Sequence, residues 1–255
     1  MLHIDGEQIS IAIDLDQGAR LASLQWRDME FVIPFRGNDY NWGWFSMVPF
    51  AGRIKNGIIR DSSGNKIQLP TIIDPPNALI GLGASASWED IGNGSQYLEL
   101  PSPFNGTSVI QRFEILDDAI RWSLRYEPSE CDLPVTLGFH PWIPRDIGKG
   151  KLAQLNFKSN KMFKRGDDLI PTGDLIDPHP QPWDDTFTQI VGIPEIIWPG
   201  VAGMRFEFDS PFVMIYTHDD EAICVEPVTA PPDAQNLGLI GENDIEMLIT
   251  FRNLY

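Results

Sequence analysis

The chain has 255 residues, of which 42% are apolar and 11% aromatic, a composition that can form a core and excludes an intrinsically disordered chain. Its formal net charge of −17 would repel phosphate backbones and anionic lipids, so we expect neither nucleic acid nor a membrane as a partner. The first residues lack the basic and apolar regions of a signal peptide, and two cysteines are too few for a disulfide framework. We therefore expect a cytoplasmic protein.

Alternation of apolar and polar residues predicts β-strands along the whole chain. The first covers residues 9–15, where isoleucines recur at every second position. Residues 107–116 and 119–126 predict a hairpin. Further predicted strands span residues 133–140, 204–208, 212–217, 222–226 and 245–251. Helical periodicity is hard to find, so the sequence predicts an all-β fold, a large antiparallel β-sandwich with one domain over residues 1–255.

Two polar residues stand at the ends of predicted strands. The alternation sends Phe139 and Val225 to the core face, and it sends His140 and Glu226 to the opposite face. Small residues precede both polar groups on that face, which indicates open space above the sheet. A proline follows each of them and is expected to end its strand. From spacing alone, a structural histidine and a solvated glutamate remain open as alternatives.

Five short motifs are more informative together than any one is alone. They are Pro49-Phe50-Ala51-Gly52-Arg53-Ile54, Asn77-Ala78-Leu79-Ile80-Gly81, Gly138-Phe139-His140-Pro141-Trp142, Trp183-Asp184-Asp185-Thr186-Phe187 and Cys224-Val225-Glu226-Pro227. In this order and approximate spacing they resemble the aldose 1-epimerases, the galactose mutarotase-like family, over most of the chain. The resemblance implies the supersandwich form of the β-sandwich and a small sugar as substrate and partner.

The resemblance also implies roles for individual residues. A histidine of the family protonates the ring oxygen of the sugar while a glutamate takes the proton of the anomeric hydroxyl, and these roles fall on His140 and Glu226. Imidazole and carboxylate suit this task, because ordinary pKa values of ~6.5 and ~4.3 let them exchange protons near neutrality. Arg53 and Asp184 match sugar-binding positions, and Trp142 offers a ring that can stack on the sugar. The implied reaction opens and recloses the ring without a metal or another cofactor.

Some positions depart from the family pattern. Ile80 stands where the family usually has a second histidine that contacts the sugar, and isoleucine can neither donate a hydrogen bond nor carry a proton. Gly52 replaces the usual asparagine before the arginine. Asp185 is adjacent to Asp184 and could be the residue that points inward. We interpret the chain as an active but divergent epimerase, present as a monomer or a homodimer.

Three other functions stay open at this stage. A non-catalytic carbohydrate-binding protein would use the same cleft without turnover. A glycoside hydrolase would pair Glu226 with Asp184 or Asp185, because that reaction uses two carboxylates. A hexose-6-phosphate 1-epimerase is suggested by Arg53, Lys55 and Arg60, which lie near one another in the sequence.

Overall fold

The structure is a computed structural model that describes residues 1–127 and 131–255. Two large antiparallel sheets dominate its fold. The larger sheet has twelve strands in the order β1 (Leu2–Asp5), β2 (Ile9–Asp14), β3 (Arg20–Trp26), β5 (Trp44–Met47), β14 (Gly138–Pro141), β23 (Ala222–Val228), β22 (Phe212–Tyr216), β19 (Asp184–Ile190), β17 (Ser159–Arg165) and β18 (Pro171–Ile176), with β4 (Met29–Glu30) beside β3 and β15 (Ile143–Pro144) beside β23.

The smaller sheet has eight strands, and short elements connect the two sheets. Its order is β10 (Glu89–Gly92), β11 (Ser95–Glu99), β12 (Ser108–Ile115), β13 (Ala119–Glu127), β24 (Asp244–Asn253), β21 (Ala202–Phe208), β20 (Glu195–Trp198) and β16 (Gln154–Asn156). The short elements are the ribbons β6 (Arg53–Ile54) with β9 (Ala78–Leu79) and β7 (Ile58–Arg60) with β8 (Lys66–Gln68), the 3-10 turns η1 (Lys55–Gly57) and η2 (Gly83–Ser85), and helix α1 (Ala234–Leu237). The helices of the described segments are all too short to cross a lipid bilayer.

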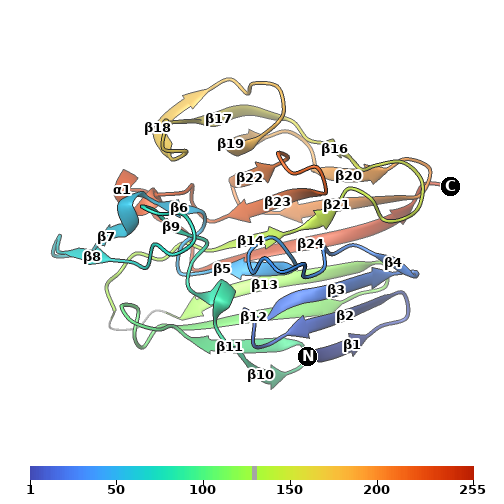
Figure 1. The fold of residues 1–255 in the computed structure, drawn as a ribbon, viewed down its shortest axis with the longest axis horizontal. Helices are drawn as coiled ribbons and strands as arrows, with labels where there is room; N and C mark the ends of the chain where they lie inside the picture. The colour runs from blue at the N-terminus through green and yellow to red at the C-terminus, as the bar shows by residue number, and fades with distance from the viewer. Residues whose placement is uncertain (128–130) are drawn as a thin grey trace.

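The main core lies between the sheets. Figure 1 shows the strands of both sheets side by side, with β18 at one end of the stack and β1 and β10 at the other. Phe139 of β14 packs on Trp122 of β13, with ring centroids 4.2 Å apart. Ile223 and Val225 of β23 belong to the same core and are fully buried. Burying a large apolar side chain contributes about 1.5–3 kcal/mol, so this core fixes how the two sheets face each other.

A second apolar cluster lies apart from this core. Its members are Ile33, Trp42, Phe45, Met47, Ala51, Ile80, Ala84, Trp142, Met214, Ala222, Cys224 and Val228. On β23, Ala222 and Cys224 alternate with the core residues Ile223 and Val225, and successive side chains of a strand point to opposite faces. The second cluster therefore covers the outer face of the larger sheet.

The predicted fold is confirmed, and two local predictions need correction. The hairpin is present as β12 and β13, which pair from Ser108↔Glu127 to Ile115↔Ile120. The predicted strand 133–140 is a strand only from Gly138, because the preceding backbone bonds elsewhere: the N–H of Thr136 donates to the Pro49 carbonyl and that of Leu137 to the Thr229 hydroxyl.

Proline ends one of the two site strands but not the other. Pro141 is the last residue of β14, as expected. Pro227 lies inside β23, where it pairs with Val213, so the expected strand end is wrong. On the side away from β22, β23 pairs with β14 only at Val228 and with β15 only at Ala222 and Ile223. No strand of the described residues pairs with Pro227 on that side, so the sheet tolerates a residue that has no backbone N–H.

Candidate active site

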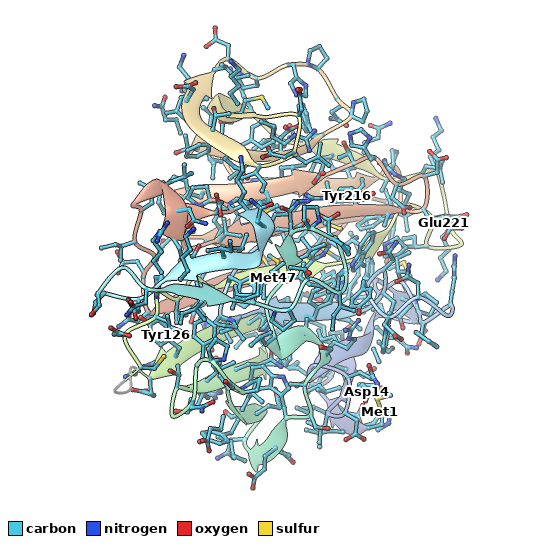
Figure 2. All side chains as sticks on the ribbon, turned by 60° about the vertical axis from the view of Figure 1, so that its left-hand side comes forward. Met1, Asp14, Met47, Tyr126, Tyr216 and Glu221 are labelled. Carbon is cyan, nitrogen blue, oxygen red and sulfur yellow. The ribbon has the colours of Figure 1, made fainter. Side chains whose placement is uncertain are left out.

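A cleft of about 320 Å³ opens on the outer face of the larger sheet. Met47 of β5 and Tyr216 of β22, both labelled in Figure 2, contribute to its lining. All the residues that the sequence singled out for the site also line it, namely Arg53, Ile80, His140, Trp142, Asp184 and Glu226. The structure thus brings together groups that are up to 173 residues apart in the chain, since 226 − 53 = 173.

The strand register places His140 beside Glu226. β14 and β23 run antiparallel and pair at Gly138↔Val228. His140 lies two residues after Gly138, and Glu226 lies two residues before Val228. The two residues are therefore cross-strand neighbours on one face of the sheet. The Nε2 atom of His140 lies 3.7 Å from Oε1 of Glu226. This separation is longer than a hydrogen bond, so the two groups are close neighbours without a direct hydrogen bond between them.

Aromatic rings enclose the imidazole of His140. Phe45 stacks on it with ring centroids 4.9 Å apart, and Trp142 stacks with a centroid distance of 5.1 Å. Burial among these rings, followed by the positive charge of Arg20, lowers the pKa of His140 to about 3. Its Nδ1 atom is buried and has no hydrogen-bond partner among the described residues. His140 is therefore a neutral imidazole at neutral pH.

Glu226 is shifted in the opposite sense. Its side chain is only 3% exposed. Burial raises the pKa of Glu226 well above its ordinary value, the charge of Asp184 raises it further, and Arg53 opposes both. Burial therefore shifts the pKa values of both groups in the direction that favours their neutral forms.

Arg53 and Asp184 belong to an ion-pair network on the cleft wall. The Nε atom of Arg53 donates to Asp74 at 2.8 Å, and its Nη1 atom lies 3.6 Å from Oδ2 of Asp184. Arg165 holds Asp184 at 2.9 Å and Asp185 at 3.1 Å. Burial raises the pKa of Asp184, while the two arginines lower it. Asp184 lines the cleft, whereas the carboxyl group of Asp185 is 2% exposed and also contacts His179 outside it.

Ile80 holds an unusual backbone conformation. Its φ angle is 57°, in the left-handed region that β-branched residues rarely adopt. Its N–H donates to the Gly52 carbonyl at 3.0 Å, and Gly81 beside it approaches the backbone of Val48 too closely for any side chain. Histidine tolerates this region better than isoleucine does. The backbone at position 80 therefore suits the histidine that the family usually has there.

Trp142 has two distinct contacts with the cleft. Its ring stacks on His140 and meets Tyr216 edge to face at 5.6 Å. Its indole N–H is buried and finds no acceptor within the described part of the chain. A buried donor without a partner is costly, and a sugar hydroxyl in the cleft is of the right chemistry to satisfy it.

Arg20 is a site residue that the sequence did not reveal. Its side chain is fully buried, and its guanidinium lies 4.5 Å from the Trp42 ring and 4.8 Å from the Phe45 ring. It donates to the backbone carbonyls of Gln17, Asp39, Trp42 and Ala84 at distances between 2.7 and 3.0 Å. Phe45 in turn stacks on His140, so Arg20 packs against the ring that holds the imidazole in place. An arginine in an alternating strand is ordinarily exposed, so no sequence signal marks it.

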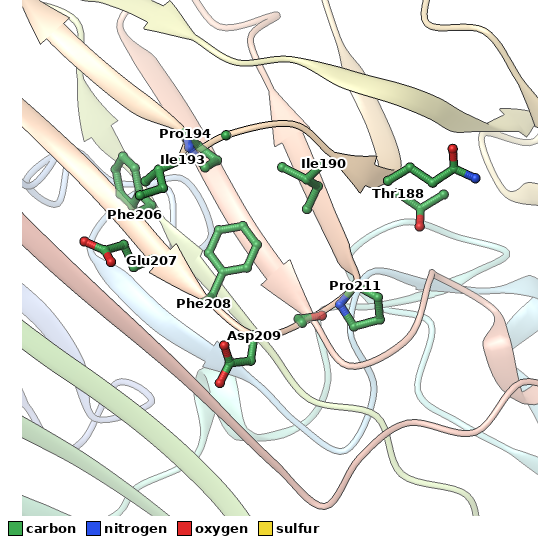
Figure 3. Close-up of a pocket in the computed structure, with 12 residues that line it drawn as sticks. Thr188, Ile190, Ile193, Pro194, Phe206, Glu207, Phe208, Asp209 and Pro211 are labelled. Atoms are coloured by element: carbon green, nitrogen blue, oxygen red, sulfur yellow. The ribbon is translucent and has the colours of Figure 1, made fainter.

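A larger hollow of about 590 Å³ lies between β19 and β21, away from these residues. Figure 3 shows Ile190, Phe208 and Pro211 on its walls, with Glu207 and Asp209 at one side. The described residues that line it include no histidine, cysteine, lysine or arginine. It therefore lacks the mixed acid and base groups that the smaller cleft provides.

The protein is a large β-sandwich with a titratable pair, His140 and Glu226, on one face of its larger sheet. Comparison with known proteins identifies its family. The family model described as aldose 1-epimerase matches residues 2–236. The chain therefore belongs to the aldose 1-epimerase family. Among curated proteins, none matches it in sequence.

Solved structures agree with this assignment at the level of the fold. An Escherichia coli K12 protein assigned as an aldose 1-epimerase superposes with a TM-score of 0.81 at 20% identity, covering 99% of this chain and 98% of that chain. The GalM/aldose epimerase homologue from C. elegans gives a TM-score of 0.78 at 15% identity over 100% and 99% of the two chains. A galactose mutarotase-like protein from Clostridium acetobutylicum gives 0.78 at 13% identity over 98% and 94%.

Proposed function

We propose that the protein is an aldose 1-epimerase that interconverts the α and β anomers of a free hexose or a related sugar. One observation carries the proposal: His140 and Glu226 are cross-strand neighbours 3.7 Å apart in the cleft. Ring opening needs one group that gives a proton and one that takes a proton, and this pair holds one of each in either protonation state.

The proposed reaction consists of two proton transfers that open the sugar ring and two that close it. One group of the pair donates its proton to the ring oxygen while the other removes the proton from the anomeric hydroxyl, so the bond between the ring oxygen and the anomeric carbon breaks and an aldehyde forms. The aldehyde rotates to present its other face, and reversal of both transfers closes the ring as the other anomer.

The remaining lining groups support sugar binding. The Asp184 carboxylate accepts hydrogen bonds and the Arg53 guanidinium donates them, which matches the mixed character of sugar hydroxyls. Trp142 adds an unpartnered N–H and an aromatic face. These contacts favour a molecule with many hydroxyl groups over a purely apolar ligand.

The charges of the cleft favour a free sugar over a sugar phosphate. Arg53 is already balanced by Asp74 and Asp184. The other two basic residues of that segment do not line the cleft: Lys55 pairs with Asp168 at 2.8 Å, and Arg60 donates to a backbone carbonyl. A phosphate would therefore meet no unbalanced positive charge among the described lining residues.

A glycoside hydrolase receives less support from the geometry. Asp185 is held outside the cleft, and Asp184 is engaged by two arginines. The ion-pair partner of Glu226 is an imidazole and not a second carboxyl group. A non-catalytic sugar-binding protein would need the cleft but not this pair.

Polarimetry on freshly dissolved α-glucose and α-galactose tests the proposal. We expect the protein to speed mutarotation of at least one of them, and H140Q to lower the rate by ~10²–10⁴-fold. H179Q is the matched control, because His179 is a histidine on the other side of the ion-pair network. Sugar binding without faster mutarotation would overturn the proposal and favour the binding protein.

A further inference from the structure

Cys224 adds a third potential metal ligand to the acid–base pair. It lies two residues before Glu226 on the same face of β23 and is fully buried. Its Sγ atom, a ring nitrogen of His140 and a carboxylate oxygen of Glu226 lie within 4.8 Å of one another. The sugar chemistry proposed above uses the imidazole and the carboxyl group but leaves the thiol without a task.

We propose that His140, Cys224 and Glu226 form an inhibitory site for a divalent cation of the zinc type, which displaces the reacting atoms of the sugar. This inference rests on the proposed function, because the cation competes with the reaction and does not serve it. The occupied site has three protein ligands, of which His140 and Glu226 line the cleft.

The distances suit a tetrahedral ion. Zinc binds nitrogen and oxygen ligands at about 2.0–2.2 Å and thiolate at about 2.3 Å. A nitrogen and an oxygen ligand on one tetrahedral ion are therefore roughly 3.3–3.5 Å apart, by the same bond lengths. The separation of 3.7 Å between His140 and Glu226 is too long for a hydrogen bond and exceeds this range by only a few tenths of an ångström. The Sγ atom of Cys224 lies within 4.8 Å of both ligand atoms and must approach them to about 3.5–3.7 Å when a cation binds.

The charges and ligand types select the cation. A neutral imidazole, a thiolate and a carboxylate bring two negative charges, which a divalent ion neutralises, so the buried site gains no net charge. Zinc accepts this mixture of nitrogen, sulfur and oxygen ligands. Mg²⁺ requires near-octahedral oxygen coordination, and the triad offers oxygen only from Glu226. The cation binds the thiolate and the carboxylate, so any proton that these groups carry passes to solvent, and no oxidation is involved.

The first test measures cation binding without reference to activity. Co²⁺ added to the purified protein is expected to produce the near-ultraviolet absorption band of a thiolate bound to cobalt, and Zn²⁺ is expected to remove it. C224S and C224A should abolish the band. C131S, which removes the other cysteine of the chain, should retain it. A wild-type protein without this band, or a C224A variant that keeps it, would overturn the site.

The second test links the site to catalysis. Zn²⁺ is expected to slow mutarotation by the wild type, reversibly on addition of a chelator, whereas Mg²⁺ at the same concentration is not. In C224S and C224A, each compared with its own metal-free rate, the inhibiting Zn²⁺ concentration should rise at least about tenfold. Equal inhibition of wild type and both variants would overturn the proposal. A cobalt band in a protein without mutarotase activity would instead keep the cation site and refute the proposed function.

Discussion

The two faces of the larger sheet use the same strands for opposite purposes. Toward the smaller sheet, Phe139 and Val225 are fully buried in a continuous apolar core. Toward the cleft, their chain neighbours His140 and Glu226 are also largely buried, but they are polar and face each other. The comparison teaches that the core fixes the register and the register then places the acid–base pair. Changes on the core face should therefore affect stability, and changes on the cleft face should affect chemistry.

The largest effect on stability is expected from F139A. It removes a ring that packs on Trp122 at 4.2 Å, so unfolding free energy should fall by about 3–5 kcal/mol. F35A is the control, because Phe35 is 54% exposed and its loss should cost less than about 0.5 kcal/mol. Urea denaturation measures both. A loss below about 1 kcal/mol in F139A would show that the core face does not hold the register.

Arg20 joins the two faces, and R20M should change both stability and pH dependence. It leaves four backbone carbonyls without their donor, which should lower stability by at least about 2 kcal/mol. It also removes a positive charge that lowers the pKa of His140, so that pKa should rise and the acid limb of the kcat/KM profile should move to higher pH. R20K keeps the charge, and its acid limb should stay in place. Identical limbs in both variants would contradict the account.

The buried imidazole should also make stability depend on pH. The pKa of His140 is about 3 in the folded protein and ~6.5 when unfolded, so the unfolded chain binds the extra proton first. Its contribution is fully present above pH 6.5 and is lost as the pH falls toward 3. Relative to H140Q, the wild type should lose up to about 1.4 kcal/mol per pH unit in this window. Denaturation curves that stay parallel across this window would refute the burial of a neutral imidazole.

The smallest effect is expected at position 80. I80H removes a β-branched residue from a left-handed conformation, which should relieve about 1 kcal/mol of strain, and it returns a hydrogen-bond donor to the cleft. We expect KM for the sugar to fall severalfold. I80A relieves the branching without adding a donor and should not lower KM. Equal KM values for I80H and I80A would show that the departure from the family pattern has no bearing on binding.

Much of the fold could be predicted from the sequence, because period-two alternation is a local signal. It located the hairpin of β12 and β13 and the faces of Phe139 and Val225 correctly. It missed that the backbone of Thr136 and Leu137 bonds to Pro49 and Thr229, because those partners lie far away in the chain. It placed a strand end at Pro227 wrongly, because which N–H groups a sheet needs depends on the neighbouring strands.

The candidate site was predictable only in part. The motifs named the residues of the cleft, but alternation could not show that Asp184 faces it while Asp185 faces Arg165 and His179. Arg20 escaped notice because its burial depends on backbone carbonyls from three separate segments. The pKa shifts of His140 and Glu226 were also out of reach, since they depend on burial and on charges that only the folded chain brings near.

A double-mutant cycle at His140 and Glu226 tests the central claim most directly. Each of H140Q and E226Q should lower kcat/KM for mutarotation by ~10²–10⁴-fold, because either change removes the group that carries out one of the two proton transfers. Since the two groups act as a unit, kcat/KM of the double variant should be no more than about tenfold below that of the less active single variant. Losses that multiply, or a single variant with more than about half of the wild-type activity, would contradict the account.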